Sequence, residues 1–225
     1  MQEFPRQIFQ RLDEAPDAEF YREPRFVNHI DAATIAALTD FYREFVPADS
    51  DVLDLMSSWV SHLPTDASYN RVAALGMNAA ELAANPQASD HCVHDLNTQP
   101  ELPYDDASFD RALIAVSIQY LIKPVEVLAS VARVLRSDGA ICIAMSHRLF
   151  PTKAILAFHR LPPNERIKLV STYLTKAGYD RVEFVDASPG KTDLNTQPGT
   201  QSNTQSNTQS EADPLWLVVG RKAGA

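Results

Sequence analysis

Residues 110–146 read DRALIAVSIQYLIKPVEVLASVARVLRSDGAICIAMS, and their pattern decides the fold. The stretches 110–118 and 140–146 are almost unbroken apolar runs, which are typical of parallel strands covered on both faces. Between them, Pro124 suits the first turn of a helix over 124–135, where apolar residues recur at helical spacing. A strand, a helix and a second strand in this order predict a mainly parallel α/β sheet.

The same alternation continues on both sides of this unit. Further strands are predicted at 52–55, 71–76, 91–96, 181–187 and 215–221. Further helices are predicted at 31–45, 79–85 and 164–178. Asp31 and Asn164 suit the N-caps, and Gly178 stands where a helix C-terminus favours glycine. We therefore expect one domain over 1–225, a seven-stranded α/β sheet with helices on both faces, preceded by an N-terminal helical extension over 1–48.

The segment 188–213 breaks this alternation. It reads SPGKTDLNTQPGTQSNTQSNTQSEAD, contains no Val, Ile or aromatic residue, and repeats the string NTQS. A segment of this kind buries too little apolar surface to offset the entropy of ordering. We expect a disordered, low-complexity insertion that joins the last two strands.

The charge and hydropathy of the chain exclude several classes of partner. The formal net charge is −9 without a cluster of Lys and Arg, which argues against nucleic acid as a partner. No apolar run approaches the roughly 18 residues that span a bilayer, and the first residues show no apolar signal core. We expect a cytoplasmic protein with no membrane partner.

The thiol and imidazole groups give no indication of a disulfide or a metal site. Cys92 and Cys142 both fall in predicted strands and are expected to be reduced, buried thiols. His91 and His94 are three residues apart on a predicted strand, so their side chains would point to opposite faces. No metal is therefore expected.

The ends of the first five predicted strands are the place to look for a ligand site. In open parallel sheets, ligands bind beyond the carboxyl ends of the strands, beside the first strand. The residues that follow these strands include Asp54, Met56, Ser57, Ser58, Gly76, Met77, Asn78, Asp95, Leu96, Ser117, Tyr120 and His147. Three of them, Asp54, Asn78 and Asp95, can accept hydrogen bonds from an amine, a ribose or an adenine.

Three strings in the second half of the chain carry a family resemblance. LPYDDASFD at 102–110, RVL at 133–135 and SDG at 137–139 flank the fourth strand, the following helix and the fifth strand. In this arrangement the chain resembles the class I methyltransferases that use S-adenosylmethionine. The resemblance covers roughly residues 50–187 and the final strand, and it implies a Rossmann-like sheet.

Three further strings resemble a narrower methyltransferase-like group found in plants and cyanobacteria. Members of that group carry a PRFV-HID stretch, a DLMSSW-SHLP first motif and an FPTKAI segment. The corresponding strings here are PRFVNHID at 24–31, DLMSSWVSHLP at 54–64 and FPTKAI at 150–155. They are long and unusual, so this second resemblance is specific.

The class I resemblance implies a strand order, a cofactor and a set of contacts to its methionine part. The order is 3-2-1-4-5-7-6 with the last strand antiparallel, and the cofactor is S-adenosylmethionine. Asp54 and the turn Met56-Ser57-Ser58 would face the methionine part, and Ser117 would lie near the transferring methyl group.

The resemblance also implies contacts to the adenosine part of the cofactor. Asn78, which follows Gly76 and Met77, would take the place of the family's ribose-binding acid. Asp95 would meet the adenine amine, and Leu96 would pack on the ring.

Two departures from the family pattern concern this site. The family's first motif is D-x-G-x-G-x-G, and DLMSSWV contains no glycine. Asn78 replaces an acid and cannot form the stronger charge-assisted bond to a ribose hydroxyl. The chain also has no G-x-G string, which disfavours a nicotinamide-dependent oxidoreductase.

The turn after the first strand allows two compatible interpretations. A short helix is predicted over 58–63, and Ser57 or Ser58 can cap its N-terminus. The same helix N-terminus would attract the carboxylate of the cofactor, with a serine hydroxyl as an additional donor.

The expected activity is methyl transfer from S-adenosylmethionine to a small molecule. His62, His147 and Tyr120 are the candidate catalytic groups, because imidazole titrates near working pH and Tyr120 can orient a nucleophile. Arg25 and Lys153 are each either a clamp for an acidic substrate or a solvated charge. The alternative is a methyltransferase-like binding or regulatory module without catalysis, which the missing glycines motivate.

Overall fold

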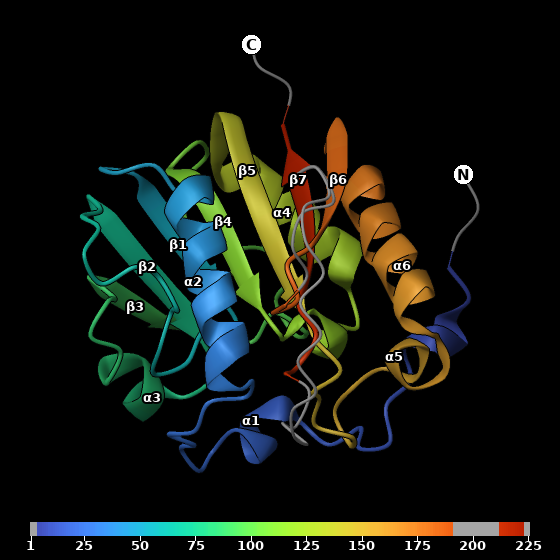
Figure 1. The fold of residues 1–225 in the computed structure, drawn as a ribbon. Helices are drawn as coiled ribbons and strands as arrows, with labels where there is room; N and C mark the ends of the chain where they lie inside the picture. Colours follow the sequence, from blue (N-terminus) through green and yellow to red (C-terminus); the bar gives the residue numbers. More distant parts are fainter. Residues whose placement is uncertain (1–3, 191–211, 223–225) are drawn as a thin grey trace, which may run out of the picture.

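The computed structural model describes residues 4–190 and 212–222, so residues 191–211 of the predicted insertion lie outside the described part. A twisted seven-stranded sheet forms the centre of the molecule, and helices cover both of its faces (Figure 1). In the described part of the chain, no helix is both long and apolar enough to cross a bilayer.

The strand order in the sheet is the order that the family resemblance implies. From one edge of the sheet to the other, the strands are β3 (Asp90–Val93), β2 (Arg71–Gly76), β1 (Asp51–Leu55), β4 (Phe109–Ala115), β5 (Leu135–Met145), β7 (Trp216–Arg221) and β6 (Arg181–Asp186). The first five are parallel, and β7 runs antiparallel to both β5 and β6. The sheet is therefore mixed but mostly parallel.

The helices follow the predicted pattern, with short additions. The helical segments are η1 (Arg6–Phe9), α1 (Asp17–Phe20), α2 (Ala32–Phe45), α3 (Ala79–Ala83), η2 (Ile118–Tyr120), α4 (Pro124–Val134), α5 (Leu156–Arg160) and α6 (Pro163–Lys176). Asp31 caps α2 by accepting a hydrogen bond from the Thr34 amide at 2.9 Å, and Pro124 begins α4. Gly178 adopts φ +93° just beyond α6, as its predicted position required, whereas the cap before α6 is Pro162 instead of Asn164.

Two apolar clusters hold the layers together. On one face, Leu38 and Tyr42 of α2 pack with Val219 of the sheet. On the other face, Val127 of α4 and Tyr173 of α6 belong to the larger cluster. The central strands are covered on both sides, which explains their continuous apolar runs.

The edge position of β3 corrects one prediction about the cysteines. Both cysteines are free, and Cys142 is fully buried in β5. Cys92, however, is only partly buried, because β3 pairs with β2 on one side alone. The prediction of two buried thiols holds for Cys142 and is wrong for Cys92.

The predicted helix over 58–63 is absent. Residues 57–64 form an irregular segment, and Ser57 and Ser58 therefore cap no helix. The amide of Ser57 donates to the carbonyl of Leu75 at 2.8 Å, which draws the chain toward the end of β2. Further along, His62 adopts φ +57°, a conformation that a right-handed helix does not allow.

The SDG string at 137–139 lies within β5, although the strand was predicted to begin at residue 140. Asp138 adopts φ +63°, and the pairing of β4 with β5 shifts register between Phe109 and Arg111. Strand β5 thus begins earlier than predicted and contains an irregularity at this point.

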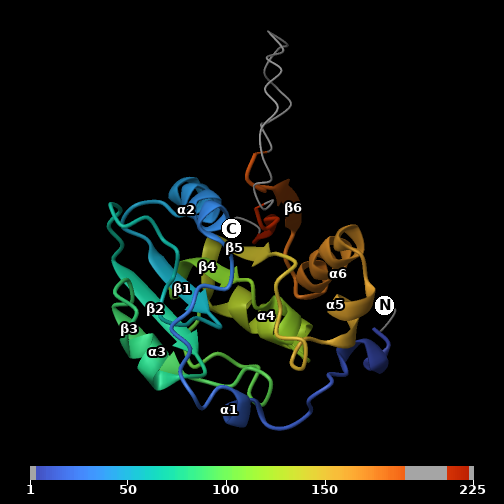
Figure 2. The same ribbon diagram turned by 60° about the horizontal axis from the view of Figure 1, so that its bottom comes forward.

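The residues before α2 run along the carboxyl edge of the sheet. In Figure 2 this blue part of the chain, including α1, passes below the strand ends before it reaches α2. We call residues 11–30 the N-terminal segment. It is joined to the strand ends by side-chain hydrogen bonds from Asn78 and Asn97, and it therefore borders any ligand that lies there.

Candidate active site

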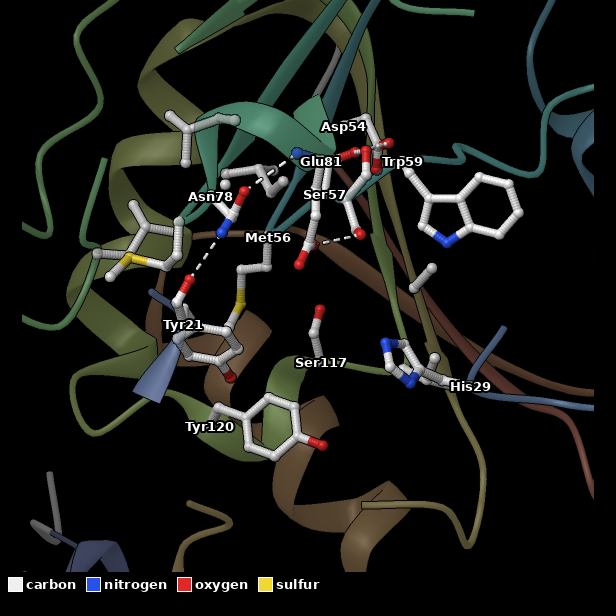
Figure 3. A pocket seen from close by; sticks show the side chains of 18 of the residues that line it. Tyr21, His29, Asp54, Met56, Ser57, Trp59, Asn78, Glu81, Ser117 and Tyr120 are labelled. Atoms are coloured by element: carbon white, nitrogen blue, oxygen red, sulfur yellow. Dashed lines mark hydrogen bonds between the residues drawn. The ribbon is translucent and has the colours of Figure 1, made fainter. Parts of the chain in front are cut away.

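A cavity lies at the carboxyl edge of the sheet, where the chain order reverses between β1 and β4 (Figure 3). All ten predicted cofactor-binding residues line it: Asp54, Met56, Ser57, Ser58, Gly76, Met77, Asn78, Asp95, Leu96 and Ser117. Two of the three predicted catalytic residues, His62 and Tyr120, line it as well, and His147 does not. The N-terminal segment contributes further lining residues, so the structure brings the predicted set together, while the roles of its members stay predictions.

The turn after β1 keeps a glycine-like backbone without a glycine. Met56 adopts φ +53°, in the left-handed region that glycine occupies most easily, and it stands at the first glycine of the D-x-G-x-G-x-G pattern. Its side chain points into the cavity in Figure 3. On the opposite side of the turn, a Cβ atom on Gly76 would lie 2.2 Å from the Ser57 carbonyl oxygen. The glycine that this turn requires is therefore Gly76.

The two serine hydroxyls of the turn are bonded to carboxylates. Ser57 Oγ donates to Asp54 Oδ2 at 2.6 Å, and Ser58 Oγ donates to Glu81 Oε2 at 2.5 Å. Burial raises the pKa of Asp54 to about 6, although hydrogen bonds from Ser57 and Ser61 lower it. Because the predicted helix is absent and the Ser57 amide is taken by Leu75, the anion site predicted at 58–63 is not built.

The side chain of Asn78 is fully used within the protein. As the N-cap of α3, its oxygen accepts from the amides of Ala80 at 3.0 Å and Glu81 at 3.1 Å. Its nitrogen donates to the carbonyl oxygens of Tyr21 at 2.9 Å and Arg22 at 3.1 Å. Asn78 thus joins α3 to the N-terminal segment.

Glu81 is a cavity carboxylate that the sequence analysis missed. It is 8 % exposed, and its Oε1 accepts from the Arg25 amide at 2.6 Å. The spacing of Asn78 and Glu81 matches a capping box, in which the acid returns to the N-cap amide. That spacing could have drawn attention to Glu81, but here its carboxylate accepts from Arg25 and Ser58 instead.

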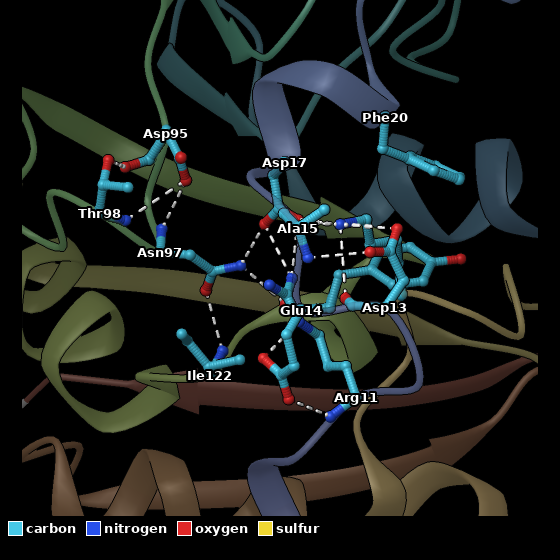
Figure 4. Close-up of polar contacts among 12 residues, drawn as sticks. Arg11, Asp13, Glu14, Ala15, Asp17, Phe20, Asp95, Asn97, Thr98 and Ile122 are labelled. Carbon is cyan, nitrogen blue, oxygen red and sulfur yellow. Dashed lines mark hydrogen bonds and ion pairs between the residues drawn. The ribbon is translucent and has the colours of Figure 1, made fainter.

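The loop after β3 is fixed by its own polar side chains. Asp95 Oδ1 accepts from the amides of Asn97 at 2.9 Å and Thr98 at 3.3 Å, and Leu96 is buried beside it. Asn97 Nδ2 donates to Asp17 Oδ2 at 2.8 Å (Figure 4). This loop is therefore also tied to the N-terminal segment.

The segment after β4 holds an unpartnered polar atom. Val116 adopts φ +43°, which is unusual for a β-branched residue, and such conformations occur at functional sites. The next residue, Ser117, is buried, and its Oγ has no hydrogen-bond partner in the described part of the chain. Tyr120 stacks on Phe150 at 5.6 Å between ring centroids, and its hydroxyl oxygen accepts from the Phe150 amide at 2.8 Å.

Two imidazoles beside the cavity are neutral at neutral pH. Burial lowers the pKa of His62 to about 4, with a smaller contribution from His29, and His62 Nδ1 has no partner among the described residues. Burial also lowers the pKa of His29, which comes from the N-terminal segment. His147, by contrast, lies 3.0 Å from Asp213, outside the lining.

Arg25 and Lys153 are neither substrate clamps nor solvated charges. The guanidinium of Arg25 lies 4.4 Å from the ring centroid of Phe20 and donates to the Phe20 carbonyl at 2.8 Å. Lys153 is fully buried and forms ion pairs with Asp13 at 3.1 Å and Asp17 at 3.2 Å. Both cations stabilise the N-terminal segment, and neither belongs to the lining of the cavity.

The comparisons with known proteins point to one family of folds. Residues 57–143 match the sequence profile of a family described as a methyltransferase domain. A search of curated proteins found no match.

Solved structures share the fold at low sequence identity. An S-adenosylmethionine-dependent methyltransferase from Archaeoglobus fulgidus has 14 % identity and a TM-score of 0.55, over 84 % of this chain and 94 % of the other. The 1,6-didemethyltoxoflavin-N1-methyltransferase from Burkholderia thailandensis, solved with S-adenosylhomocysteine, has 16 % identity and a TM-score of 0.55, over 85 % of this chain and 79 % of the other. The [4+2]-cyclase SpnF has 14 % identity and a TM-score of 0.57, over 84 % and 81 %.

The profile match covers residues 57–143, and the solved structures share the fold of the whole sheet. They support a methyltransferase with S-adenosylmethionine as its cofactor. At this level of identity the structural similarity itself concerns the fold, which hosts more than one chemistry.

Proposed function

We propose that this protein transfers a methyl group from S-adenosylmethionine to a small, uncharged or cationic acceptor. The observation that carries the proposal is the acidic cavity at the switch point of the sheet. Its lining includes four carboxylates, from Asp17, Asp54, Glu81 and Asp95, and no Lys or Arg among the described residues; only Asp17 of the four is paired with cations, Arg11 and Lys153, from outside the lining. A sulfonium, an ammonium and an adenine amine all suit such a lining, whereas an anionic acceptor does not.

The residues of the cavity fit the cofactor. The unpartnered Oγ of buried Ser117 is a polar group that a ligand can satisfy. Asp54 is buried at the end of β1, and a nearby cation would favour its charged form. Asp54 and Ser117 would hold the methionine part and the region of the methyl group, and Asp95 would hold the adenine amine.

The protein's contribution would be alignment and exclusion of water. The cofactor supplies an already activated methyl group, so the acceptor needs an in-line approach more than a strong catalyst. Tyr21, Trp59 and Tyr120 give the cavity aromatic walls, and the N-terminal segment covers its edge. These walls favour a flat, largely apolar acceptor.

His62 is the strongest of the predicted catalytic candidates. Its imidazole lines the cavity, and its unpartnered Nδ1 can accept a hydrogen bond from an acceptor molecule, although burial lowers its pKa to about 4 and so makes it a weak base at working pH. Tyr120 would orient the acceptor. His147 stays a prediction that rests on its place after β5 alone.

The narrower group with the DLMSSW-SHLP motif is part of the same proposal. Its three strings are far apart in sequence, yet each contributes to the cavity. His29 comes from PRFVNHID, Ser57 from DLMSSWVSHLP and Phe150 from FPTKAI, and all three line it. This convergence supports a shared functional reason for the three strings.

The test is calorimetry followed by an acceptor panel. Purified protein should bind S-adenosylmethionine and S-adenosylhomocysteine, and should form S-adenosylhomocysteine in the presence of flat neutral or cationic acceptors. No binding at high micromolar ligand would refute the proposal. Binding without product across a broad panel would favour the non-catalytic binding module.

A further inference from the structure

We propose that Glu81 binds the ribose hydroxyls of the cofactor, in place of the residue at position 78. The inference rests on the proposed function and assigns one contact within it. Its starting point is the number of hydrogen bonds that Asn78 and Glu81 can still form in the described structure.

Asn78 has no hydrogen-bonding capacity left for a ribose. A carboxamide offers one oxygen with two lone pairs and one nitrogen with two hydrogens. The oxygen accepts from Ala80 and Glu81, and the nitrogen donates to Tyr21 and Arg22. A ribose hydroxyl could bond to Asn78 only by breaking the cap of α3 or the attachment of the N-terminal segment.

Glu81 has the capacity that Asn78 lacks. A carboxylate has about four acceptor positions, and the contacts from Arg25 and Ser58 use one on each oxygen. Its side chain points into the cavity from the first turn of α3 (Figure 3). In the described part of the chain, no cationic side chain forms an ion pair with Glu81, although it is 8 % exposed.

A buried carboxylate without a cationic partner needs further hydrogen bonds. The two hydroxyls of a ribose can donate them, and bonds to a charged acceptor are stronger than bonds to an amide. Glu81 would therefore supply, three residues further along the chain, the negative charge that Asn78 does not carry.

The competing explanation is that Glu81 only fastens the turn at Ser58 to the N-terminal segment at Arg25. The two explanations differ in how the effect of a substitution depends on the ligand. A residue that fastens the protein should affect all cofactor-like ligands equally, whereas a ribose-binding residue should affect only ligands with ribose hydroxyls.

The experiment measures binding of S-adenosylhomocysteine and of its 2′,3′-dideoxy analogue by calorimetry, in the wild type and in Glu81→Gln. Glu81→Gln should lose at least about tenfold in affinity for S-adenosylhomocysteine and less than about twofold for the analogue. Equal losses for the two ligands would overturn the inference, and so would unchanged affinity for both.

Asn78→Asp is the companion variant: it keeps the cap acceptor and adds a charge at the position that the family resemblance favours, and its loss of the donors to Tyr21 and Arg22 should affect both ligands equally. No hydroxyl-dependent gain is expected; such a gain would overturn the assignment to Glu81, even if Glu81→Gln failed to fold. If the wild type binds neither ligand, the proposed function itself fails, which separates the two results.

Discussion

Lys153 lies at the centre of a buried ion network that fixes the N-terminal segment. Its ammonium is fully buried, pairs with Asp13 and Asp17, and donates to the Ala15 carbonyl at 2.6 Å. Arg11 adds two bonds to Asp17, at 2.7 and 2.9 Å (Figure 4). A cation 138 positions from Ala15 in the sequence thus stabilises residues that border the cavity.

Replacing Lys153 with Met should lower the free energy of unfolding by about 3 kcal/mol. The thioether side chain keeps the length and most of the volume, so the change removes mainly the charge and the donors. Breaking a buried pair from one side costs roughly 3–5 kcal/mol. The lower value is expected because Arg11 still pairs with Asp17. For a chain of this size, the melting temperature should fall by roughly 6–12 °C.

The matched control is Arg43→Met, at an ion pair on the surface. Arg43 and Asp66 are 2.8 Å apart, but their side chains are 48 % and 68 % exposed. Such a pair contributes less than about 1 kcal/mol. Urea denaturation of both variants gives the comparison. Equal losses of stability in the two variants would refute the reasoning that burial makes the Lys153 network strong.

Three other substitutions test the site itself. Ser117→Ala removes a buried, unpartnered hydroxyl, so it should change stability by less than about 1 kcal/mol while weakening cofactor binding; denaturation and calorimetry on one preparation check both. Gly76→Ala places a Cβ atom 2.2 Å from the Ser57 carbonyl oxygen and should cost about 3 kcal/mol in urea denaturation; a neutral result would mean that the turn moves freely. The pKa of Asp54 is raised to about 6 in the folded protein, against an ordinary 3.8. The folded state therefore holds the proton more tightly than the unfolded state, and this contribution to the free energy of unfolding is lost as the pH rises through 6. Asp54→Asn should therefore gain about 2 kcal/mol relative to the wild type between pH 4 and pH 7, and a pH-independent difference would contradict this.

The fold could be predicted because its signals are local. The apolar runs at 110–118 and 140–146 identify central strands, and residues such as Asp31 and Gly178 mark helix ends with groups that the backbone requires there. The prediction of a helix over 58–63 was wrong because the conformation there depends on a hydrogen bond from the Ser57 amide to the carbonyl of Leu75, a residue of another strand. Local sequence carries no information about such a contact.

The residues of the site that directly follow strands could also be predicted, because the order of the strands determines where they lie. Parallel strands bring their carboxyl ends to one edge, so the residues after β1, β2, β3 and β4 had to meet. Glu81 was missed because its two partners, Arg25 and Ser58, come from distant parts of the chain. The bond from Arg25 to Glu81 joins residues 56 positions apart, and local sequence does not indicate such a contact.

The glycine-free first motif is best understood through the contacts that replace glycine. A left-handed backbone at Met56 costs roughly 1–2 kcal/mol, so it persists only because other contacts hold the turn. The Ser57 amide is fixed by Leu75, the Ser57 and Ser58 hydroxyls are fixed by Asp54 and Glu81, and Gly76 leaves room for the Ser57 carbonyl. In this chain, the position that must be glycine for lack of space is Gly76 at the end of β2, and no residue of the turn itself. At Met56 the backbone shape that glycine usually permits is therefore present without glycine, and what differs from the family pattern is the Met56 side chain, which points into the cavity.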